Sequence, residues 1–370
     1  MCAAASPADA KTAVIGYVFP DGAAIQQGEI DPLRLTRINY AFAAIRNGQM
    51  VADSPEDAQN LALLTSLRQQ NPSLTVLISV GGWNGSGGFS DVALTPASRA
   101  LFIHSASALI GRYHLDGLDV DWEYPGQPGD GNRFRSQDKQ NFTLLLQGLR
   151  EQFDRETAGT GRRLYLTIAA EASEEYLDRT EMAGVQRYVD SVNLMAYDFY
   201  EPGSDPITGP LAPLFVSPGE PKQVSANQSV LAFEQAGVPA AKIVLGVPFY
   251  GRAWSGVANR NHGLYQTGKP AHPAELPYNR IAGTMLRQGF TRYWDSAASV
   301  PYLYNPDRHI FVTYEDPQSL AAKCHYVLTH HLAGVMFWDY SSDPSGTLLG
   351  TIDKAFHLPE TGPSPNRGHP

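Results

Sequence analysis

Eight short apolar runs alternate along this chain with longer segments that have room for a helix. The runs occupy residues 13–19, 37–43, 74–80, 115–125, 164–170, 191–196, 243–249 and 334–338. Short strands that are rich in β-branched residues and alternate with helices are typical of a parallel sheet covered on both faces. Eight repeats of this unit favour a closed (β/α)8 barrel, the TIM barrel of the α/β class, over an open sheet. The predicted barrel covers residues 11–251 and 316–358.

The segment between the seventh and eighth runs is too long for a single helix. Residues 252–315 contain several prolines, many aromatic residues and two β-like stretches, at 302–304 and 309–314. A structureless loop of this size is implausible inside a compact domain. We therefore expect a small α+β insertion over residues 252–315 that forms a wall beside the barrel mouth. The proline- and glycine-rich loop 197–225 is expected to frame the opposite rim.

The fourth run carries three acids, Asp119, Asp121 and Glu123, at alternate positions. In an extended strand these side chains share one face, while Val120 and Trp122 point to the other. Unpaired buried charges are very costly, so the acids must share protons or line a cleft. The alternative is a solvated acidic edge strand, but the glycine and apolar residues beside the acids indicate a buried strand. In such barrels the catalytic residues collect at the C-terminal ends of the strands, where these acids lie.

Polar and aromatic side chains mark the same end of the other predicted strands. They are Tyr17, Tyr40, Phe42, Ser79, Met195, Tyr197, Tyr250 and Trp338. A single aromatic residue at a strand end is more often part of the core than a ligand platform. The gathering of many of them around three acids shifts the balance toward a binding cleft.

The charge balance and the cysteine content exclude several classes of function. The formal net charge is −9, which argues against a nucleic-acid partner or an anionic membrane surface. No stretch approaches the 18 apolar residues that a membrane span needs. The two cysteines, Cys2 and Cys324, imply no disulfide framework, and Cys324 is expected to be a buried thiol in a helix. No His/Cys cluster with metal-ligand spacing and no phosphate-binding glycine loop is present, so we expect no cofactor and no metal.

The two ends of the chain are expected to be disordered tails, over residues 1–10 and 359–370. The small residues that follow Cys2 resemble the mature start of a bacterial lipoprotein from which the leader has been removed. An ordinary tail is the alternative. The chain is expected to be secreted or held at the cell surface, and to be a monomer.

Several motifs make this chain resemble the family 18 glycoside hydrolases, the chitinases. Residues 116–123 match the family signature D-G-x-D-x-D-x-E, and residues 79–82, 195–198 and 246–252 match the motifs on strands three, six and seven. Trp338 stands where the eighth strand of the family has its tryptophan. The insertion looks like that of the bacterial-type, deep-cleft subgroup. Structural roles are implied for the motif residues Ser79, Gly81, Gly82, Asp116 and Gly117.

The resemblance implies hydrolysis of β-1,4 bonds between N-acetylglucosamine units, in chitin or its oligosaccharides, by substrate-assisted retaining catalysis. Glu123 would be the general acid and base, and Asp121 would orient the acetamide of the substrate. Asp119 would share a proton with Asp121, Tyr197 would hydrogen-bond the acetamide oxygen, and Trp338 would form the floor under the sugar. From the residues alone, the like charges of Asp119 and Asp121 are expected to keep Glu123 protonated near neutral pH.

Further substrate contacts are implied for residues around these five. They are Tyr17, Phe42, Trp83, Met195, Asp198, Tyr250 and Arg252, with Trp254 as a weaker candidate for a stacking platform.

Three alternatives differ from this interpretation in function. A non-catalytic, chitinase-like lectin usually loses the acid, which is present here as Glu123. An endo-acting enzyme on the N-glycan core shares the acidic strand, but the predicted deep groove and Trp338 favour a linear chitin-like chain. An unrelated barrel enzyme, such as an aldolase, would call for a lysine, a metal or a phosphate site in the motifs. The sequence leaves open whether cleavage is internal or from a chain end.

Overall fold

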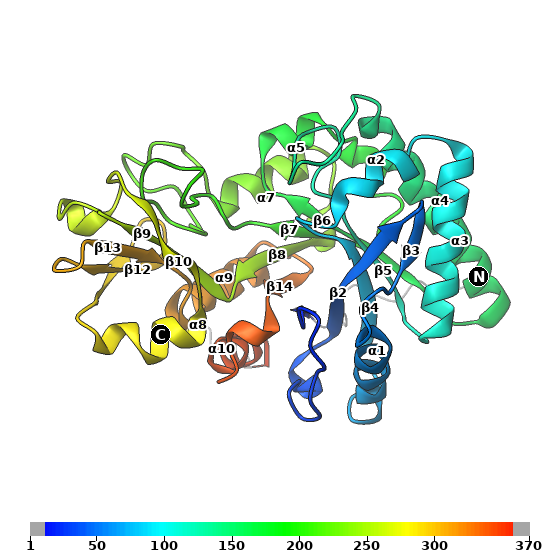
Figure 1. Cartoon of the computed structure of the whole chain (residues 1–370), viewed down its shortest axis with the longest axis horizontal. Helices are drawn as coiled ribbons and strands as arrows, with labels where there is room; N and C mark the ends of the chain where they lie inside the picture. The colour runs from blue at the N-terminus through cyan, green and yellow to red at the C-terminus, as the bar shows by residue number, and fades with distance from the viewer. Residues whose placement is uncertain (1–11, 358–370) are drawn as a thin grey trace, which may run out of the picture.

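The computed structural model describes residues 12–357, and its centre is a closed barrel of eight parallel strands (Figure 1). The barrel closes because β1 pairs in parallel with both β14 and β2. Its strands are β1 (Ala13–Val18), β2 (Arg37–Arg46), β4 (Thr75–Gly81), β5 (Gly117–Asp121), β6 (Tyr165–Glu171), β7 (Ser191–Met195), β8 (Ile243–Pro248) and β14 (Gly334–Trp338). The predicted (β/α)8 barrel is confirmed. The predicted tails and Cys2 lie outside the described residues.

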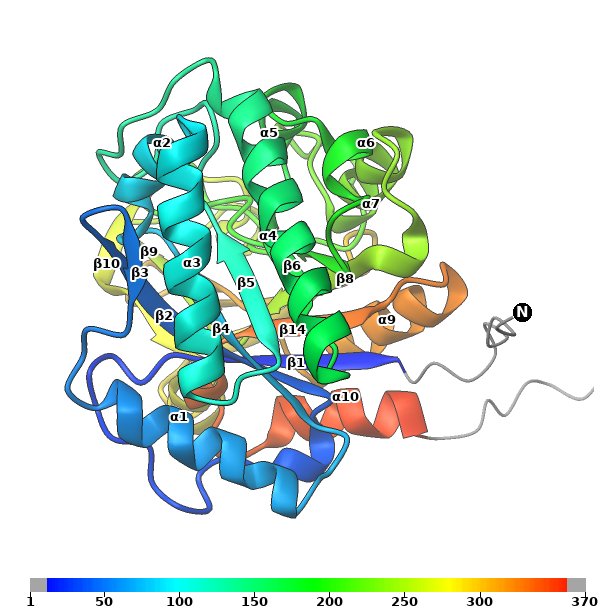
Figure 2. The ribbon, with the colours of Figure 1, turned by 90° about the vertical axis from the view of Figure 1, so that its right-hand side faces the viewer.

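Helices cover the outer face of the barrel, and Figure 2 shows α3 and α4 lying in front of β5. Two of them start where the sequence has a capping box followed by proline, with Thr95 before α3 and Asp316 before α9. The helices are α1 (Asp57–Ser66), α2 (Phe89–Val92), α3 (Pro96–Arg112), α4 (Asp138–Thr160), α5 (Glu174–Asp178), α6 (Met182–Val185), α7 (Ala226–Gln235), α8 (Tyr278–Gly283), α9 (Pro317–Thr329) and α10 (Thr347–His357). Within residues 12–357, no helix has the length and apolar character to cross a membrane.

The outward face of β5 anchors the strand to this helical layer. Trp122, just past the strand end, is buried and stacks on Phe89 with ring centroids 5.2 Å apart. Its edge meets Phe142 of α4 at 5.7 Å. The predicted outward direction of Val120 and Trp122 is confirmed, since both belong to the core between barrel and helices. The acids of the strand are therefore left to the inside of the barrel.

A second, antiparallel sheet stands beside the barrel mouth, at the left of Figure 1. It is built between β8 and β14, as predicted, and its order is β10-β9-β13-β12-β11. Its strands are β9 (Tyr250–Ser255), β10 (Lys269–Pro277), β11 (Thr291–Asp295), β12 (Val300–Asn305) and β13 (Ile310–Thr313). Together with α8 they form the expected α+β insertion. The domain boundaries at residues 252 and 315 stay a prediction.

Candidate active site

The three acids lie at the C-terminal end of β5, but only two of them are on the strand. β5 ends at Asp121, and Glu123 lies in the loop that follows. The hydroxyl of Ser86 donates to the Asp121 carbonyl oxygen (3.0 Å), and the Glu123 amide donates to the Ser86 hydroxyl oxygen (2.9 Å). The prediction of three acids on one strand is wrong for Glu123, because the loop after β4 takes over its backbone bonding. This loop fixes where the Glu123 side chain starts.

Asp119 is completely buried and accepts four side-chain hydrogen bonds. The donors are the Tyr17 hydroxyl (2.8 Å), the Ser79 hydroxyl (2.8 Å), the Thr167 hydroxyl (2.5 Å) and the Asn193 amide (3.0 Å). Burial raises the pKa of Asp119, whereas the hydrogen bonds from Thr167, Tyr17 and Ser79 act to lower it. A carboxyl group with donors on both oxygens is well suited to the ionised state.

Asp121 lies one step closer to the barrel mouth and is nearly completely buried. Its Oδ1 atom has no hydrogen-bond partner among the described residues. Burial, and then the charges of Glu123 and Asp119, hold the pKa of Asp121 well above its usual range. Such a group retains a proton and has one oxygen available for a ligand.

Glu123 is partly buried, and its pKa is raised to about 7. Burial is the largest cause, and the charges of Glu171, Asp198 and Glu201 add to it, while a hydrogen bond from Tyr124 opposes it. The sequence interpretation expects the rise from the like charges of Asp119 and Asp121 in a partly dry site. The structure adds acids from other segments at the barrel mouth. Their negative charges favour the protonated form of Glu123. A carboxylic acid that is still protonated near neutral pH can donate a proton to a leaving group.

Trp338 and Tyr197 lie in the same hydrophobic cluster above the acids. Trp338 stacks on Phe42 (centroids 5.6 Å apart) and lies 5.8 Å from the ring of Tyr17, which bonds Asp119. The ring of Tyr197 meets Tyr250 edge to face at 6.3 Å. Burial and the charge of Asp121 raise the pKa of Tyr197 well above its usual range, so its hydroxyl stays a donor. An aromatic floor with a hydroxyl donor thus covers the carboxyl groups.

The insertion side of the site is organised around Arg252 on β9. Its guanidinium contacts both oxygens of Asp198 at 3.1 Å, Glu201 at 3.0 Å and Glu275 at 2.5 Å. The Tyr250 hydroxyl donates to the same Asp198 carboxylate at 2.7 Å. The predicted residues Asp198, Tyr250 and Arg252 are therefore brought together. One arginine faces three carboxylates here, and burial raises the pKa of Glu201 to about 7.

The glycine motif after β4 makes room for the site. A Cβ on Gly81 (φ +108°) would lie 2.0 Å from the Asp121 carbonyl oxygen, and one on Gly82 (φ +75°) 2.6 Å from the ring of Phe42. Only glycine fits both the backbone conformation and these close approaches. Gly117 and Asp116 act at the opposite end of β5. The carboxylate of Asp116 accepts from the Val76 amide (2.8 Å) and pairs with two arginines, Arg68 and Arg162.

The remaining residues that were expected to contact the substrate lie in different surroundings. Trp83 is 50% exposed and meets Tyr124, the residue after Glu123, edge to face at 6.3 Å. Met195 ends β7 and packs in the cluster of Trp338. The expectation for Trp254 is wrong, because its side chain is completely buried in the core of the insertion, against Phe311. Its ring has no face left for a sugar.

Tyr40 and Phe42 point to different faces of β2, although the regular alternation of side chains along a strand predicts that residues two apart share one face. The Tyr40 hydroxyl donates to Asp57 of α1 (2.6 Å), so its ring lies outside the barrel, whereas Phe42 stacks on Trp338 inside the mouth. The reason is a register shift between β2 and β4 that lies between Tyr40 and Ala43. An irregularity of this kind changes the face to which later side chains point.

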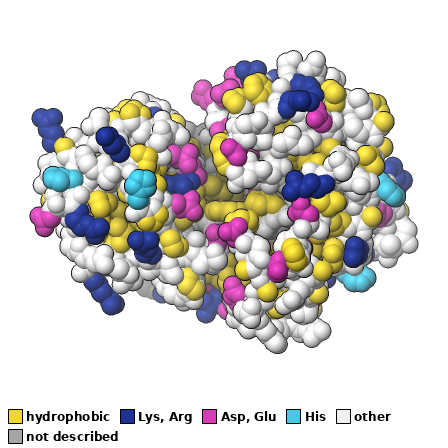
Figure 3. All heavy atoms as spheres, viewed as in Figure 1, with side chains coloured by type: hydrophobic (Ala, Val, Ile, Leu, Met, Phe, Trp, Pro, Cys, Tyr) yellow, Lys and Arg dark blue, Asp and Glu magenta, His cyan; other side chains and the backbone are white. Residues whose placement is uncertain are grey.

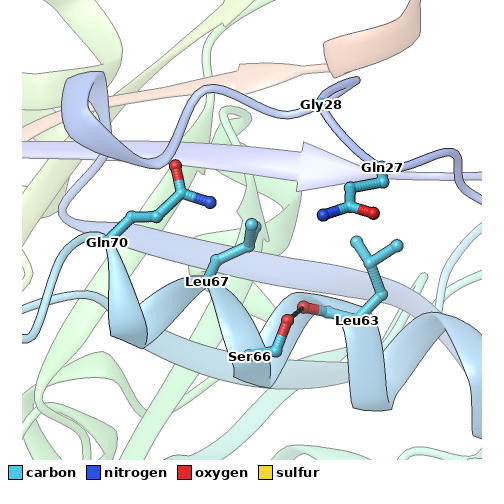
Figure 4. A pocket seen from close by; sticks show the side chains of 6 residues that line it. All are labelled: Gln27, Gly28, Leu63, Ser66, Leu67 and Gln70. Carbon is cyan, nitrogen blue, oxygen red and sulfur yellow. Dashed lines mark hydrogen bonds between the residues drawn. The ribbon is translucent and has the colours of Figure 1, made fainter.

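The surface is hollowed between the part that carries the second sheet and the part formed by the barrel (Figure 3). Hydrophobic side chains lie in this groove and acidic side chains gather at its margins. A different hollow lies against α1 and the 3-10 turn Leu67–Gln69, away from β5 (Figure 4). It is lined by Gln27, Gly28, Leu63, Ser66, Leu67 and Gln70. This second hollow holds no charged side chain, and the Ser66 hydroxyl is bonded to the Leu63 carbonyl oxygen.

Sequence reasoning missed several residues of the site. Thr167 and Asn193 hydrogen-bond Asp119, and Glu171 adds charge beside Glu123. A polar residue inside an otherwise apolar strand was a usable signal for Thr167 and Asn193. The motif 246–252 marks Gly246, but not its role, which is to leave space for Tyr197: a Cβ there would lie 2.9 Å from the Tyr197 ring.

Comparisons with known proteins agree with this geometry. The sequence profile of the glycosyl hydrolases family 18 matches residues 13–343. Chitinase A1 of Niallia circulans is 38% identical over 94% of this chain and 60% of its own length. The structure of chitinase ChiW from Paenibacillus sp., described as a cell-surface-expressed multi-modular enzyme, gives a TM-score of 0.88 at 39% identity, over 94% of this chain and 33% of that one.

A third relative is similar in length to this chain. It is the family 18 N-acetylglucosaminidase of Paenibacillus barengoltzii, with a TM-score of 0.85 at 42% identity over 93% of this chain and 99% of that one. The chain spans less than two thirds of the length of Chitinase A1 and of ChiW. The profile match, the barrel and the acids at the end of β5 together establish that this chain belongs to family 18 of the glycosyl hydrolases.

Proposed function

We propose that this chain is a chitinase, which hydrolyses β-1,4 bonds between N-acetylglucosamine units with retention of configuration. The observation that carries the proposal is that the three carboxyl groups at the end of β5 differ in their hydrogen bonds and in their affinity for a proton. Asp119 is saturated with donors, Asp121 has a free oxygen, and Glu123 holds a proton at the groove. The chitinases among the relatives support the substrate class.

Glu123 donates its proton to the glycosidic oxygen as the bond to the anomeric carbon breaks. The acetamide oxygen of the same sugar attacks that carbon, which forms a cyclic oxazolinium ion. Asp121 accepts from the acetamide N–H with its unpartnered oxygen, the single negative charge of the Asp119 and Asp121 pair balances the positive charge, and Tyr197 donates to the acetamide oxygen. Water then attacks the anomeric carbon while the Glu123 carboxylate takes its proton, and the acetamide is released.

A protein carboxylate is a weaker candidate for the nucleophile than the acetamide, because Asp198 and Glu171 already accept hydrogen bonds from neighbouring side chains. Both oxygens of Asp198 are bound by Arg252, and one also by Tyr250. Glu171 accepts from Gln127 and from Ser173, each at 2.8 Å. The unpartnered oxygen nearest Glu123 on β5 belongs to Asp121, which favours a role beside the acetamide.

Substrate contacts are proposed for the aromatic floor and for both walls of the groove. Trp338 lies under the sugar that is cleaved, and Tyr17, Phe42 and Met195 support it from below. Asp198, Tyr250 and Arg252 contact sugar hydroxyls from the insertion side, and Trp83 offers a half-exposed ring beyond Glu123. Chitin or its oligosaccharides are the partners, and the chain acts as a monomer outside the cell or at its surface.

Release of the chromophore from an aryl chitobioside tests this function directly. The chain is expected to release it with retention of configuration, seen by NMR as the β-anomer of the first-formed product. A chain that binds N-acetylglucosamine oligosaccharides in calorimetry but releases no chromophore would be a lectin, and the proposal would be wrong.

Cleavage of single units from a chain end is a second candidate. The similarity in length and the 42% identity to the N-acetylglucosaminidase of Paenibacillus barengoltzii favour it. The initial products from the N-acetylglucosamine hexamer separate the two. Monomer as the only early product indicates the glucosaminidase, whereas dimers to tetramers indicate the chitinase.

The activity is expected to depend on the protonated form of Glu123. An acid catalyst is present below its pKa and is lost as the pH rises through that value. With a pKa of about 7 for Glu123, kcat/KM is expected to fall about tenfold per pH unit above about pH 7. The rate profile between pH 4 and 10 measures this, with recovery after return to pH 6 as the control for unfolding. A profile that stays flat to pH 9 would contradict the assignment.

A further inference from the structure

A positively charged side chain lies inside the base of the barrel, at the opposite end from the groove. Arg37, the first residue of β2, is partly buried and extends across the barrel. Its Nε lies 3.4 Å from the Thr75 hydroxyl on β4, and its Nη1 lies 3.4 Å from the Ser191 hydroxyl on β7. The guanidinium stands 5.2 Å from the ring centroid of Tyr165 on β6. One side chain thus contacts three other strands.

A chain of hydrogen bonds connects this cation with the acids. Arg37 donates to Ser191, Ser191 donates to the Asn193 Oδ1 atom (3.5 Å), and the Asn193 amide donates to Asp119 (3.0 Å). Every link points from the cation toward the anion. Hydrogen bonds aligned in this way polarise one another. The interior of the barrel, usually filled by branched apolar residues, is here a polar path.

We propose that Arg37 is a positioning residue for the reaction: its charge favours the ionised form of Asp119, and so leaves the proton of the carboxyl pair to Asp121. The proposal rests on the function proposed above, because it concerns the same acids. No bond is formed or broken; a single proton is assigned to one of two carboxyl groups. A purely structural role, as a plug of the barrel base, is the competing explanation.

Other charges around Arg37 and Asp119 leave this effect intact. The charged and titratable groups that face them are Tyr17, Asp121, Glu123, Tyr165, Asp190 and Tyr197. Asp190 is the strongest negative charge acting on Arg37, but it also pairs with Arg150 (3.4 Å) and Arg163 (2.5 Å), so Arg37 is not its sole partner. Arg37 acts to lower the pKa of Asp119, against the effect of burial.

The acid limb of the pH profile tests this role. The carboxyl pair must keep one negative charge for catalysis, so a higher proton affinity of Asp119 moves the acid limb to higher pH. Arg37→Gln and Arg37→Met are expected to raise this limb by about half a pH unit, which is about a threefold loss of kcat/KM below it. Arg37→Lys keeps the charge, so its acid limb is expected to stay at the pH of the unaltered chain. Arg37→Met keeps apolar packing on Tyr165 and serves where Arg37→Gln does not fold.

Arg163→Gln is the matched control. Its guanidinium lies 5.1 Å from the same Tyr165 ring, but its side chain is 65% exposed and outside the path to Asp119. This variant is expected to keep the acid limb in place. Profiles of the neutral Arg37 variants that superimpose on the unaltered one, or an equal shift in Arg163→Gln, would overturn the inference. If the unaltered chain cleaves no aryl chitobioside, the proposed function fails instead.

Discussion

Glu123→Gln is expected to lower kcat/KM about 10²- to 10⁴-fold, the range that a positioned general acid contributes. The amide cannot give a proton to the glycosidic oxygen, although it has nearly the size and shape of the acid. Its backbone stays fixed by Ser86 and by Asn132, whose amide donates to the Glu123 carbonyl oxygen at 3.0 Å. The loss should therefore appear in kcat, with the dissociation constant of the N-acetylglucosamine tetramer nearly unchanged.

Glu171→Gln is the matched control for this experiment. Glu171 ends the neighbouring strand β6, is partly buried and has a raised pKa, but accepts its hydrogen bonds from Gln127 and Ser173. An acid that acts only by its charge on Glu123 should cost less than about tenfold when it is neutralised. Initial rates on an aryl chitobioside, with tetramer binding measured by calorimetry, separate the two variants. Near-normal turnover by Glu123→Gln would end the assignment of the acid.

The barrel could be predicted because each strand is specified by its own residues. Gly334–Trp338 has the predicted bounds, and most other strands differ by one or two residues at an end. The second sheet was predicted from the β-like stretches that correspond to β12 and β13. The short strand β3 (Gln49–Val51) was missed, although Asn47-Gly48, both with positive φ, is a strong hairpin signal.

The parts of the site that could not be predicted depend on contacts between strands. The position of Glu123 beyond β5 is set by Ser86, and the direction of Phe42 is set by a register shift against β4. The sequence around Trp254 does not show whether its side chain is exposed or buried. Only the packing of the insertion shows that it is buried. Local spacing thus pointed to the acids at the end of β5, whereas their hydrogen-bond partners could be found only in the closed barrel.

The same limit applies to the electrostatics. The alternation of acids predicts a raised pKa for one of them, but it does not say which residues raise it. Glu171 ends β6, whereas Asp198 and Glu201 lie in the loop after β7, and all three act on Glu123. The charges of Asp198 and Glu201 are balanced by Arg252, which lies on β9 of the second sheet. The insertion therefore contributes to the electrostatic environment of Glu123 as well as forming a wall of the groove.

Oligosaccharides of glucosamine that carry no acetyl groups are expected not to be cleaved at all. In the proposed mechanism the nucleophile belongs to the substrate, and the free amine cannot replace the acetamide oxygen. The free Asp121 oxygen and the Tyr197 hydroxyl would then have no acetamide to hold. Binding should persist, because a groove with acidic margins attracts a cationic chain (Figure 3). Loss of turnover without loss of binding is the expected signature.

Partially acetylated chains provide the sharper form of this experiment. Cleavage is expected only where the sugar that supplies the anomeric carbon is acetylated, so every newly formed reducing end should be N-acetylglucosamine. Mass spectrometry of products labelled at the reducing end measures this, and the acetylated tetramer is the control for activity. New reducing ends that carry glucosamine would mean that a group of the protein attacks the anomeric carbon. Asp121, with its unpartnered oxygen beside Glu123, would then be the first residue to test as that nucleophile.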